Sequence, residues 1–307
     1  MSASMGGEMM IAGMLAPGAT LEKMASGCIW AEGPAWVSGD QSVRWSDIPN
    51  DRIMQFHPGS NTASVYRSDV GFTNGRTTDA TGAVVQCSHG ARALELDDGH
   101  SVTTIVSTWT GRRFNSPNDV VVHSDGSIWF TDPPYGIQVE GEGYPGEREY
   151  GDNFVFRIDP RDTSVTVVIA DVEEPNGLAF SPDESILYVS DTSAARATDG
   201  GGNRHIRAYD VIDGLICKNG RTIMSLESGL PDGFRVDGHG RIWSSSDSGV
   251  QIFAPEGDHL ATIDVPEVVS NLCFGGADGS DLYITATTSL YRIRTRTTDA
   301  SAVWRRK

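Results

Sequence analysis

Residues 176–191 read NGLAFSPDESILYVSD. A small and apolar segment follows Asn176, a turn-forming Ser-Pro-Asp-Glu run comes next, and an aliphatic and aromatic segment ends at Asp191. Strand-type residues on both sides of such a turn predict a β-hairpin. The same pattern, at nearly equal length, occurs six times along the chain: Glu32 to Asp47, Asn74 to His89, Asn118 to Asp132, Asn176 to Asp191, Asp232 to Ser246 and Asn271 to Ala286.

Each hairpin is followed by further strand-like segments. After the third hairpin these are residues 153–158 and 164–169, and after the fifth they are residues 249–253 and 259–263. A repeat of about 40 residues that contains four strands is typical of a propeller blade. The sequence therefore predicts an all-β fold, a six-bladed β-propeller of four-stranded antiparallel blades.

The ends of the chain and one insertion complete this prediction. The last unit has only three clear strands, so we expect an N-terminal strand near residues 20–24 to supply the fourth and close the ring. Residues 1–18 are expected to form an N-terminal tail or edge segment, and residues 19–307 a single propeller domain. Residues 137–151, rich in Glu and Gly, interrupt the third unit and are interpreted either as a lid or as a solvated loop.

Composition limits the partners of the protein. Lys and Arg number 24 against 41 Asp and Glu, a formal net charge of −17 over 307 residues. Such a surface repels nucleic-acid phosphates and anionic lipids, so we expect small molecules and cations as partners, with no nucleic acid and no membrane. The 35 glycines have no collagen-like period and therefore indicate many turns. We expect a monomer or a homodimer.

The cysteines and the N-terminus indicate the compartment. Cys28, Cys87, Cys217 and Cys273 form no C-x-x-C pair, and we expect buried free thiols, with one or two disulfides left open. A short apolar run at residues 9–16 has no Lys or Arg before it, unlike a secretory signal. The expected location is cytoplasmic.

The first residues of the six hairpins indicate a site. In a propeller the first strand of each blade lines the central channel, so these six side chains should converge near the axis. All six carry a side-chain oxygen, as expected for a site that binds a hard divalent cation such as Ca²⁺ or Mg²⁺. Turn formation alone would explain Asn-Gly or Asp-Gly, but Glu is a poor turn former. The six openers are Glu32, Asn74, Asn118, Asn176, Asp232 and Asn271.

Five motifs in order resemble those of the gluconolactonase / senescence marker protein family of six-bladed propellers, in its bacterial lactonase branch. They are Glu32-Gly33-Pro34-Ala35-Trp36, Asn115-Ser116-Pro117-Asn118-Asp119, Phe130-Thr131-Asp132-Pro133-Pro134-Tyr135-Gly136, Pro175-Asn176-Gly177-Leu178 and Leu230-Pro231-Asp232-Gly233. The resemblance implies that the metal ligands are four of the six openers: Glu32, Asn118, Asn176 and Asp232. Asn74 and Asn271 are then expected to lie beside these ligands or in the pocket wall.

The resemblance also implies a reaction, the hydrolysis of D-glucono-1,5-lactone or a related sugar lactone. One divalent cation, Ca²⁺ or alternatively Mg²⁺, Mn²⁺ or Zn²⁺, would polarise the lactone carbonyl, and Asp232 would activate water. His89, Tyr135, Asn74 and Asn271 are the predicted substrate-binding residues, although a structural role for His89 is an equal alternative. Asp132, Asp191 and Arg92 are weaker candidates for the site, with bracing of the channel mouth as their alternative role.

Two alternatives to this function remain open at the level of sequence. The same cation site would suit a phosphotriesterase-like hydrolase of organophosphates, and a non-catalytic binding propeller would use the same fold. At the position of Asn118, the motif of mammalian family members resembles R-x-N-D-G. This chain has Ser116-Pro117-Asn118-Asp119 there and so lacks the Arg. The sequence therefore supports lactonase chemistry more strongly than it supports any particular sugar.

Overall fold

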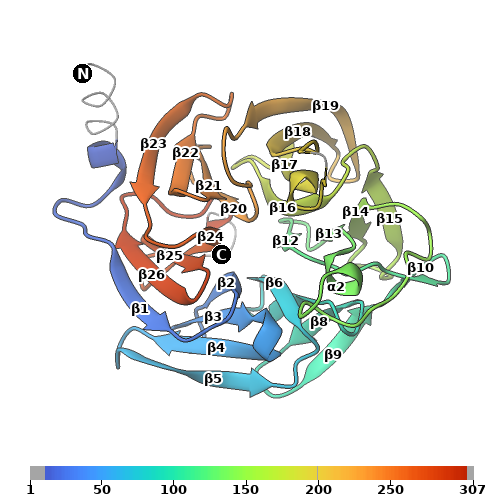
Figure 1. Ribbon diagram of the computed structural model, residues 1–307, viewed down its shortest axis with the longest axis horizontal. Helices are drawn as coiled ribbons and strands as arrows, with labels where there is room; N and C mark the ends of the chain where they lie inside the picture. Colours follow the sequence, from blue (N-terminus) through green and yellow to red (C-terminus); the bar gives the residue numbers. More distant parts are fainter. Residues whose placement is uncertain (1–10, 199, 303–307) are drawn as a thin grey trace.

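The computed structural model describes residues 11–198 and 200–302. Six four-stranded antiparallel sheets surround a central axis and form a six-bladed β-propeller (Figure 1). In the last sheet β1 (Glu22–Ser26) pairs with β26 (Ser289–Arg294) and so joins the two ends of the chain. The predicted fold is confirmed, and the closing strand lies two residues further along the chain than predicted.

The blades share one order of strands from the axis outward. The innermost strands are β2 (Ala31–Val37), β6 (Thr73–Thr78), β12 (Val120–Val122), β16 (Pro175–Phe180), β20 (Phe234–Val236) and β24 (Val269–Gly275). The second strands are β3 (Ser42–Asp47), β7 (Val84–Ser88), β13 (Ile128–Asp132), β17 (Ile186–Asp191), β21 (Ile242–Ser246) and β25 (Asp281–Ala286). The third strands are β4 (Arg52–His57), β8 (Ala93–Asp97), β14 (Phe154–Ile158), β18 (His205–Ile212), β22 (Gly249–Phe253) and β26. The outermost strands are β5 (Thr62–Ser68), β9 (Val102–Val106), β15 (Val165–Ile169), β19 (Ile216–Ser225), β23 (His259–Asp264) and β1.

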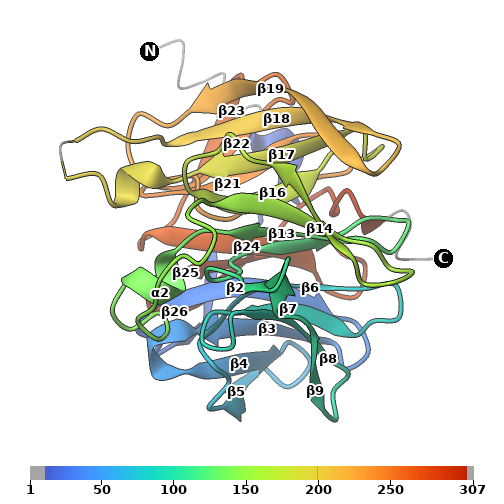
Figure 2. The ribbon, with the colours of Figure 1, turned by 90° about the vertical axis from the view of Figure 1, so that its right-hand side faces the viewer.

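The remaining elements are short. β10 (Thr108–Trp109) and β11 (Arg112–Arg113) form a small hairpin between the second and third blades. Single helical turns follow the second strands of three blades: η1 (Ile48–Asn50), α2 (Tyr135–Gln138) and η2 (Ser193–Ala195). In the side view α2 lies toward one face of the ring (Figure 2). No helix in the described ranges is long and apolar enough to cross a bilayer.

Apolar packing between neighbouring blades holds the ring together. Val85 and Cys87 of the second blade pack in one buried cluster with Val120, Phe130 and Phe156 of the third. A corresponding cluster joins the first and last blades, and it contains Cys28, Val43, Trp45, Phe56, Cys273, Tyr283 and Leu290. Each buried side chain of this size contributes about 1.5–3 kcal/mol relative to exposure, so the interfaces between blades supply much of the stability.

The N-terminal segment and the cysteines can be placed. Of residues 1–18, residues 1–10 lie outside the described residues. Met14 is buried in the cluster of the last blade, and Leu15 forms a β-bridge with Thr295, so this part packs against the propeller instead of forming a loose tail. All four cysteines are free thiols, and all but the half-buried Cys217 are buried.

Buried aspartates at the ends of second strands fasten the loops that enter the blades. Asp47 accepts hydrogen bonds from the backbone N–H of Ile29 at 2.8 Å and from Arg52 Nε at 2.9 Å. In the same way Asp132 accepts from the N–H groups of Asn115 and Ser116, both at 2.8 Å. Asp191 accepts from the N–H groups of Glu173 and Glu174, at 2.9 and 3.2 Å. These residues therefore brace the loops at the channel mouth, the alternative role considered for Asp132 and Asp191.

We predict that Asp47→Asn destabilises the protein. The amide has one acceptor oxygen in place of two, so at least one buried donor loses its charge-assisted partner, and we expect a loss of about 2–3 kcal/mol in the free energy of unfolding. Urea denaturation followed by tryptophan fluorescence measures this loss. Asp98→Asn is the control, because Asp98 is exposed and accepts hydrogen bonds only within its own turn; an equal loss in both variants would contradict the bracing role.

Candidate active site

The six openers lie side by side around the channel. Gly75 N–H donates to the carbonyl oxygen of Asn118 at 2.8 Å, and Gly177 N–H donates to that of Asp232 at 3.0 Å. Asn271 Nδ2 donates to Glu32 Oε2 at 3.1 Å, which connects the last blade to the first. The blades approach so closely that a Cβ on Gly233 would lie 2.0 Å from Cγ of Asn271. The sequence repeat therefore places its openers in one ring.

Irregular strand pairing turns these side chains toward the axis. The register between the first two strands of a blade shifts between Glu32 and Ala35, between Thr73 and Arg76, and between Pro175 and Leu178. In the third and fifth blades the opener precedes the innermost strand. A bulge releases a residue from the regular alternation of side chains and redirects it. The openers thus leave the sheet pattern at the mouth of the channel.

Glu32 is a buried carboxylate with few compensating partners. Its side chain is 4% exposed, and Oε2 accepts hydrogen bonds from Asn271 Nδ2 and from the N–H of Gly33. Burial raises the pKa of Glu32 well above its usual value, and the negative charges of Asp232 and Asp119 raise it further. The environment therefore disfavours the ionised carboxylate unless a positive charge is brought to it.

Asp232 stands in a similar environment. Burial raises its pKa to about 7, the charge of Glu142 adds to this, and a hydrogen bond with Asn176 opposes the shift. Arg235 Nη1 lies 3.2 Å from Asp119 Oδ2 and so compensates the third acid nearby. The charges of Glu32 and Asp232 are left without an equivalent partner among the described side chains.

The two asparagines of the predicted ligand set belong to the same ring. Asn176 Nδ2 donates to Thr192 Oγ1 at 3.1 Å, which leaves its Oδ1 available as an acceptor. Asn118 is held through its backbone, since its N–H donates to Thr131 O at 2.9 Å, and Thr131 Oγ1 in turn donates to Asn176 O at 2.6 Å. Two carboxylates and two amide oxygens suit a hard divalent cation.

This donor set fits the expected cation on grounds of charge as well as ligand type. Burial and neighbouring acids raise the pKa values of Glu32 and Asp232, so a cation that balances their negative charges would favour the ionised carboxylates. No group of three or more His, Cys, Asp or Glu side chains suited to a metal is found in residues 11–198 and 200–302. A cation at this ring would therefore depend on the amide oxygens of Asn118 and Asn176 as well as on the carboxylates.

His89 and Asn74 form a buried pair at the same mouth. His89 Nδ1 lies 2.8 Å from the carbonyl oxygen of Glu142, and Nε2 lies 3.4 Å from Asn74 Nδ2. Burial lowers the pKa of His89 to about 4, so the ring is neutral at pH 7, with Nδ1–H as donor and Nε2 as acceptor. Both ring nitrogens thus have partners within the protein, which favours a positioning role over proton transfer.

Tyr135 and Asn271 support ring residues from two sides. The Tyr135 hydroxyl, at the start of α2, lies 2.6 Å from Thr192 Oγ1, the same atom that accepts from Asn176. Asn271 uses Nδ2 on Glu32 and Oδ1 on the N–H of Leu272 at 2.8 Å. Both residues therefore orient predicted ligands, whatever contact they also make with a substrate.

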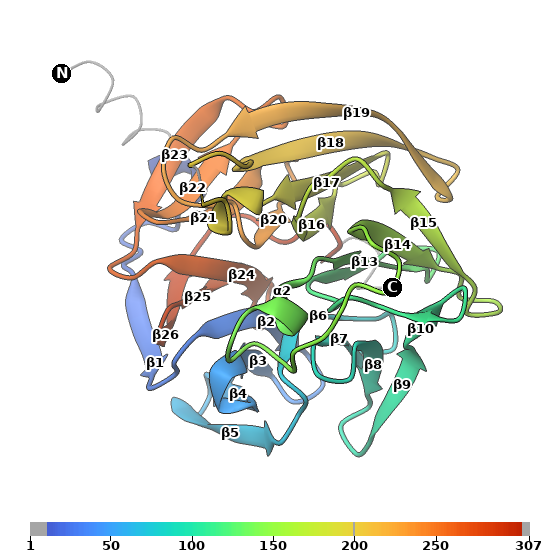
Figure 3. The same ribbon diagram turned by 45° about the vertical axis from the view of Figure 1, so that its right-hand side comes forward.

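The insertion at residues 137–151 packs over this mouth. Besides the contact of Glu142 with His89, the ring of Tyr144 meets Phe72 edge to face at 5.2 Å, and Arg92 Nη2 donates to Glu147 O at 3.1 Å. Figures 1 and 3 show α2 and the following segment beside the central channel. These contacts hold the segment at this mouth, while Glu140, Tyr144 and residues 147–149 stay exposed to solvent, so the lid and the solvated loop both remain predictions.

Three residues at the site were not singled out from the sequence. Asp119 directly follows Asn118, and its negative charge acts on Glu32. Thr192 directly follows Asp191 and contacts Asn176. Both residues are therefore neighbours in sequence of predicted positions. Glu142 lies in the insertion, where no repeat indicates its neighbours. Only the folded structure brings Glu142 to His89 and Asp232.

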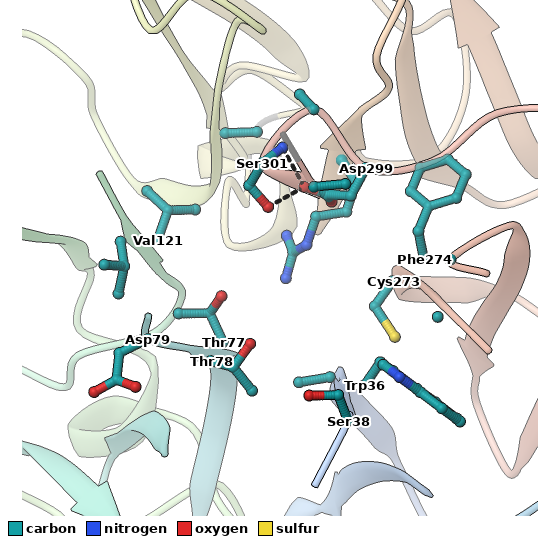
Figure 4. A pocket seen from close by; sticks show the side chains of 18 of the residues that line it. Trp36, Ser38, Thr77, Thr78, Asp79, Val121, Cys273, Phe274, Asp299 and Ser301 are labelled. Carbon is teal, nitrogen blue, oxygen red and sulfur yellow. Dashed lines mark hydrogen bonds between the residues drawn. The ribbon is translucent and has the colours of Figure 1, made fainter. Parts of the chain in front are cut away.

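A cavity of about 380 Å³ lies at the opposite end of the channel (Figure 4). Its walls come from the far ends of the innermost strands, including Trp36 and Val121, and from Asp299 and Ser301 near the C-terminus. None of the four predicted ligands lines it. We therefore place the candidate active site at the ring of openers, where the uncompensated carboxylates lie.

Two arginines separate this cavity from the ring. Arg76 and Arg235 both line the cavity. Arg76 Nη1 donates to Gly33 O at 2.7 Å, and Arg235 contacts Asp119. The cavity and the ring are thus distinct parts of one channel.

Comparisons with known proteins agree with this architecture. A family profile described as the SMP-30/Gluconolactonase/LRE-like region matches residues 30–288. A gluconolactonase of Zymomonas mobilis is 32% identical over 303 residues, covering 90% of this chain and 82% of that protein. The pentonolactonase XacC of Haloferax volcanii is 30% identical over 264 residues, covering 84% and 81%.

A solved structure is similar over nearly the whole chain. A gluconolactonase from Xanthomonas campestris superposes with a TM-score of 0.86 at 36% identity, covering 93% of this chain and 92% of that one. The sequence motifs, the six blades and these similarities lead to one assignment. The chain belongs to the SMP-30/gluconolactonase/LRE-like family.

Proposed function

We propose that this protein is a metal-dependent lactonase that hydrolyses D-glucono-1,5-lactone or a related aldonolactone. The observation that carries the proposal is the pair of buried, uncompensated carboxylates, Glu32 and Asp232, in a ring with two amide oxygens. The relatives named gluconolactonase and pentonolactonase support lactone hydrolysis as the reaction. The proposed ligands of the cation are Glu32, Asn118, Asn176 and Asp232, with Ca²⁺ as the first candidate.

The residues of the ring suggest a mechanism. A bound divalent cation would polarise the lactone carbonyl and stabilise the negative charge that develops on its oxygen. Asp232 accepts a proton from water as the water oxygen attacks the carbonyl carbon. The bond between the carbonyl carbon and the ring oxygen then breaks, the proton passes to that oxygen, and the product is a hydroxy acid. Tyr135 and Thr192 hold Asn176 in place during these steps.

We predict that lactonase activity requires both the cation and Asp232. EDTA should abolish proton release from gluconolactone above the spontaneous rate, added Ca²⁺ should restore it, and Asp232→Asn should lower kcat at least about 100-fold because the base is lost. Initial rates measured with a pH indicator check all three. Turnover that survives both chelation and the substitution would show that the mechanism is wrong.

We predict that the affinity for Ca²⁺ rises with pH between about 5 and 8. The raised pKa values mean that the cation-free ring takes up protons, so protons compete with the cation at low pH. Above pH 7 the ionised pair destabilises the cation-free fold, and Ca²⁺ should then raise Tm most. Calorimetric titration at several pH values measures the affinity, and an affinity independent of pH would contradict this account.

We predict that gluconolactone is a better substrate than an organophosphate. The comparison is kcat/KM for gluconolactone against that for paraoxon under the same conditions. A higher value on paraoxon would favour the phosphotriesterase alternative, and binding of gluconolactone without turnover would favour a non-catalytic propeller.

A further inference from the structure

We propose that Arg76 is a positioning residue for Glu32, which it holds in place from beneath the ring of openers without contacting the cation or the substrate. This inference rests on the proposed cation site and adds to it a residue outside the ligand set. Arg76 is the third residue of the second hairpin. The third residues of the other five hairpins are uncharged: Pro34, Val120, Leu178, Phe234 and Cys273.

Arg76 is a charged group at a position where the fold itself requires none. It is 1% exposed, and its hydrogen-bond partners in the described part of the chain are all neutral oxygens. Burial lowers the pKa of Arg76 to about 10, so the guanidinium still carries its charge at pH 7. Burying such a group costs free energy that the uncharged residues of the other five hairpins do not cost. The guanidinium therefore indicates a role beyond packing.

The guanidinium contacts the residues on two sides of Glu32. Nη1 donates to the carbonyl oxygen of Gly33, the residue directly after Glu32, at 2.7 Å. Nη2 donates to Ser46 Oγ at 2.6 Å, and Ser46 pairs with Glu32 across the first two strands of the blade. The planar fork of an Arg side chain suits two acceptors at once. One rigid group thus holds both the next residue in the chain and the residue opposite Glu32.

The backbone at Gly33 lies outside the regular ladder of the blade. The register shifts between Glu32 and Ala35, and Gly33 has a φ of +50°, in the left-handed region. A Cβ on Gly33 would lie 2.1 Å from the carbonyl oxygen of Asn74. Gly33 N–H also donates to Glu32 Oε2. A rotation of the backbone at Gly33 would therefore move the Glu32 carboxylate, and the contact with Arg76 opposes that rotation.

The same guanidinium joins the first blade to the second. Nη2 also donates to Thr73 Oγ1 at 3.2 Å, and Thr73 directly precedes the opener Asn74. Ser46 Oγ, which accepts from Arg76, donates to the carbonyl oxygen of Asn74 at 3.1 Å. Arg76 thus fixes two neighbouring openers relative to each other. Replacing a residue that orients a metal ligand typically weakens the metal affinity about 10- to 100-fold.

Positioning and charge make opposite predictions for the affinity of the site. A positive charge near the ring repels a cation, so with charge alone Arg76→Met would lower the Kd for Ca²⁺ and Arg76→Lys would leave it unchanged. With positioning, both variants should bind Ca²⁺ more weakly, because Met has no donor and Lys lacks the planar fork. We expect the Kd to rise about 10- to 100-fold in both. Calorimetric titration with Ca²⁺ at constant pH measures it without any turnover.

Two further variants separate positioning from a general loss of stability. Arg157 is also buried, and it donates to Gly214 O at 2.9 Å and to Asp159 Oδ2 at 3.2 Å in another blade. Arg157→Met should lower Tm but leave the Kd for Ca²⁺ unchanged. Ser46→Ala removes one of the two acceptors and should raise the Kd about 3-fold. Added to Arg76→Lys, it should raise the Kd by less than that, because the shared contact is already lost.

The outcomes distinguish this inference from the proposed site. An unchanged or lower Kd in Arg76→Met, or an unchanged Kd in Arg76→Lys, would overturn the positioning role. An equal rise in Arg157→Met would also overturn it, since a loss of stability would then explain both. If Arg76→Met does not fold, Arg76→Lys and Ser46→Ala decide the question. Wild-type protein that binds no Ca²⁺ would overturn the proposed cation site itself.

Discussion

The burial of two carboxylates, Glu32 and Asp232, in one ring at the propeller axis is the constraint on which the site depends. Both carboxylates are desolvated, the charges of Asp232 and Asp119 act on Glu32, those of Glu142 and Asp119 act on Asp232, and no described side chain neutralises the pair. Such an arrangement opposes folding unless another contact compensates it. The inter-blade clusters provide the stability that lets the ring keep this charge at its centre, and a divalent cation bound there would remove the repulsion.

Much of this architecture could be predicted from the sequence because the repeat is regular. Hairpins of nearly equal length place equivalent residues at equivalent points, so the sequence alone assigns the six openers to one ring. The ring-closing strand followed from counting strands, since only the N-terminus could complete the last blade. Its position shifted by two residues because pairing with β26 fixes the register.

The contacts that tune the site could not be predicted in the same way. Thr192 orients Asn176 through a hydrogen bond between side chains, and local sequence does not specify that partner. His89 was open to a catalytic or a structural role, and only burial together with its two partners favours the positioning role. Glu142 reaches the site because the insertion at residues 137–151 folds back over the mouth. This insertion lies outside the repeat, so the repeat does not predict its path.

The proposed cation site is one place in the molecule, the centre of the ring of openers. Anomalous diffraction from crystals grown with Mn²⁺, compared with crystals grown with EDTA, locates the cation. We expect a single strong anomalous peak within bonding distance of the side-chain oxygens of Glu32, Asn118, Asn176 and Asp232. A peak elsewhere in the channel, or no peak at saturating Mn²⁺, would contradict it.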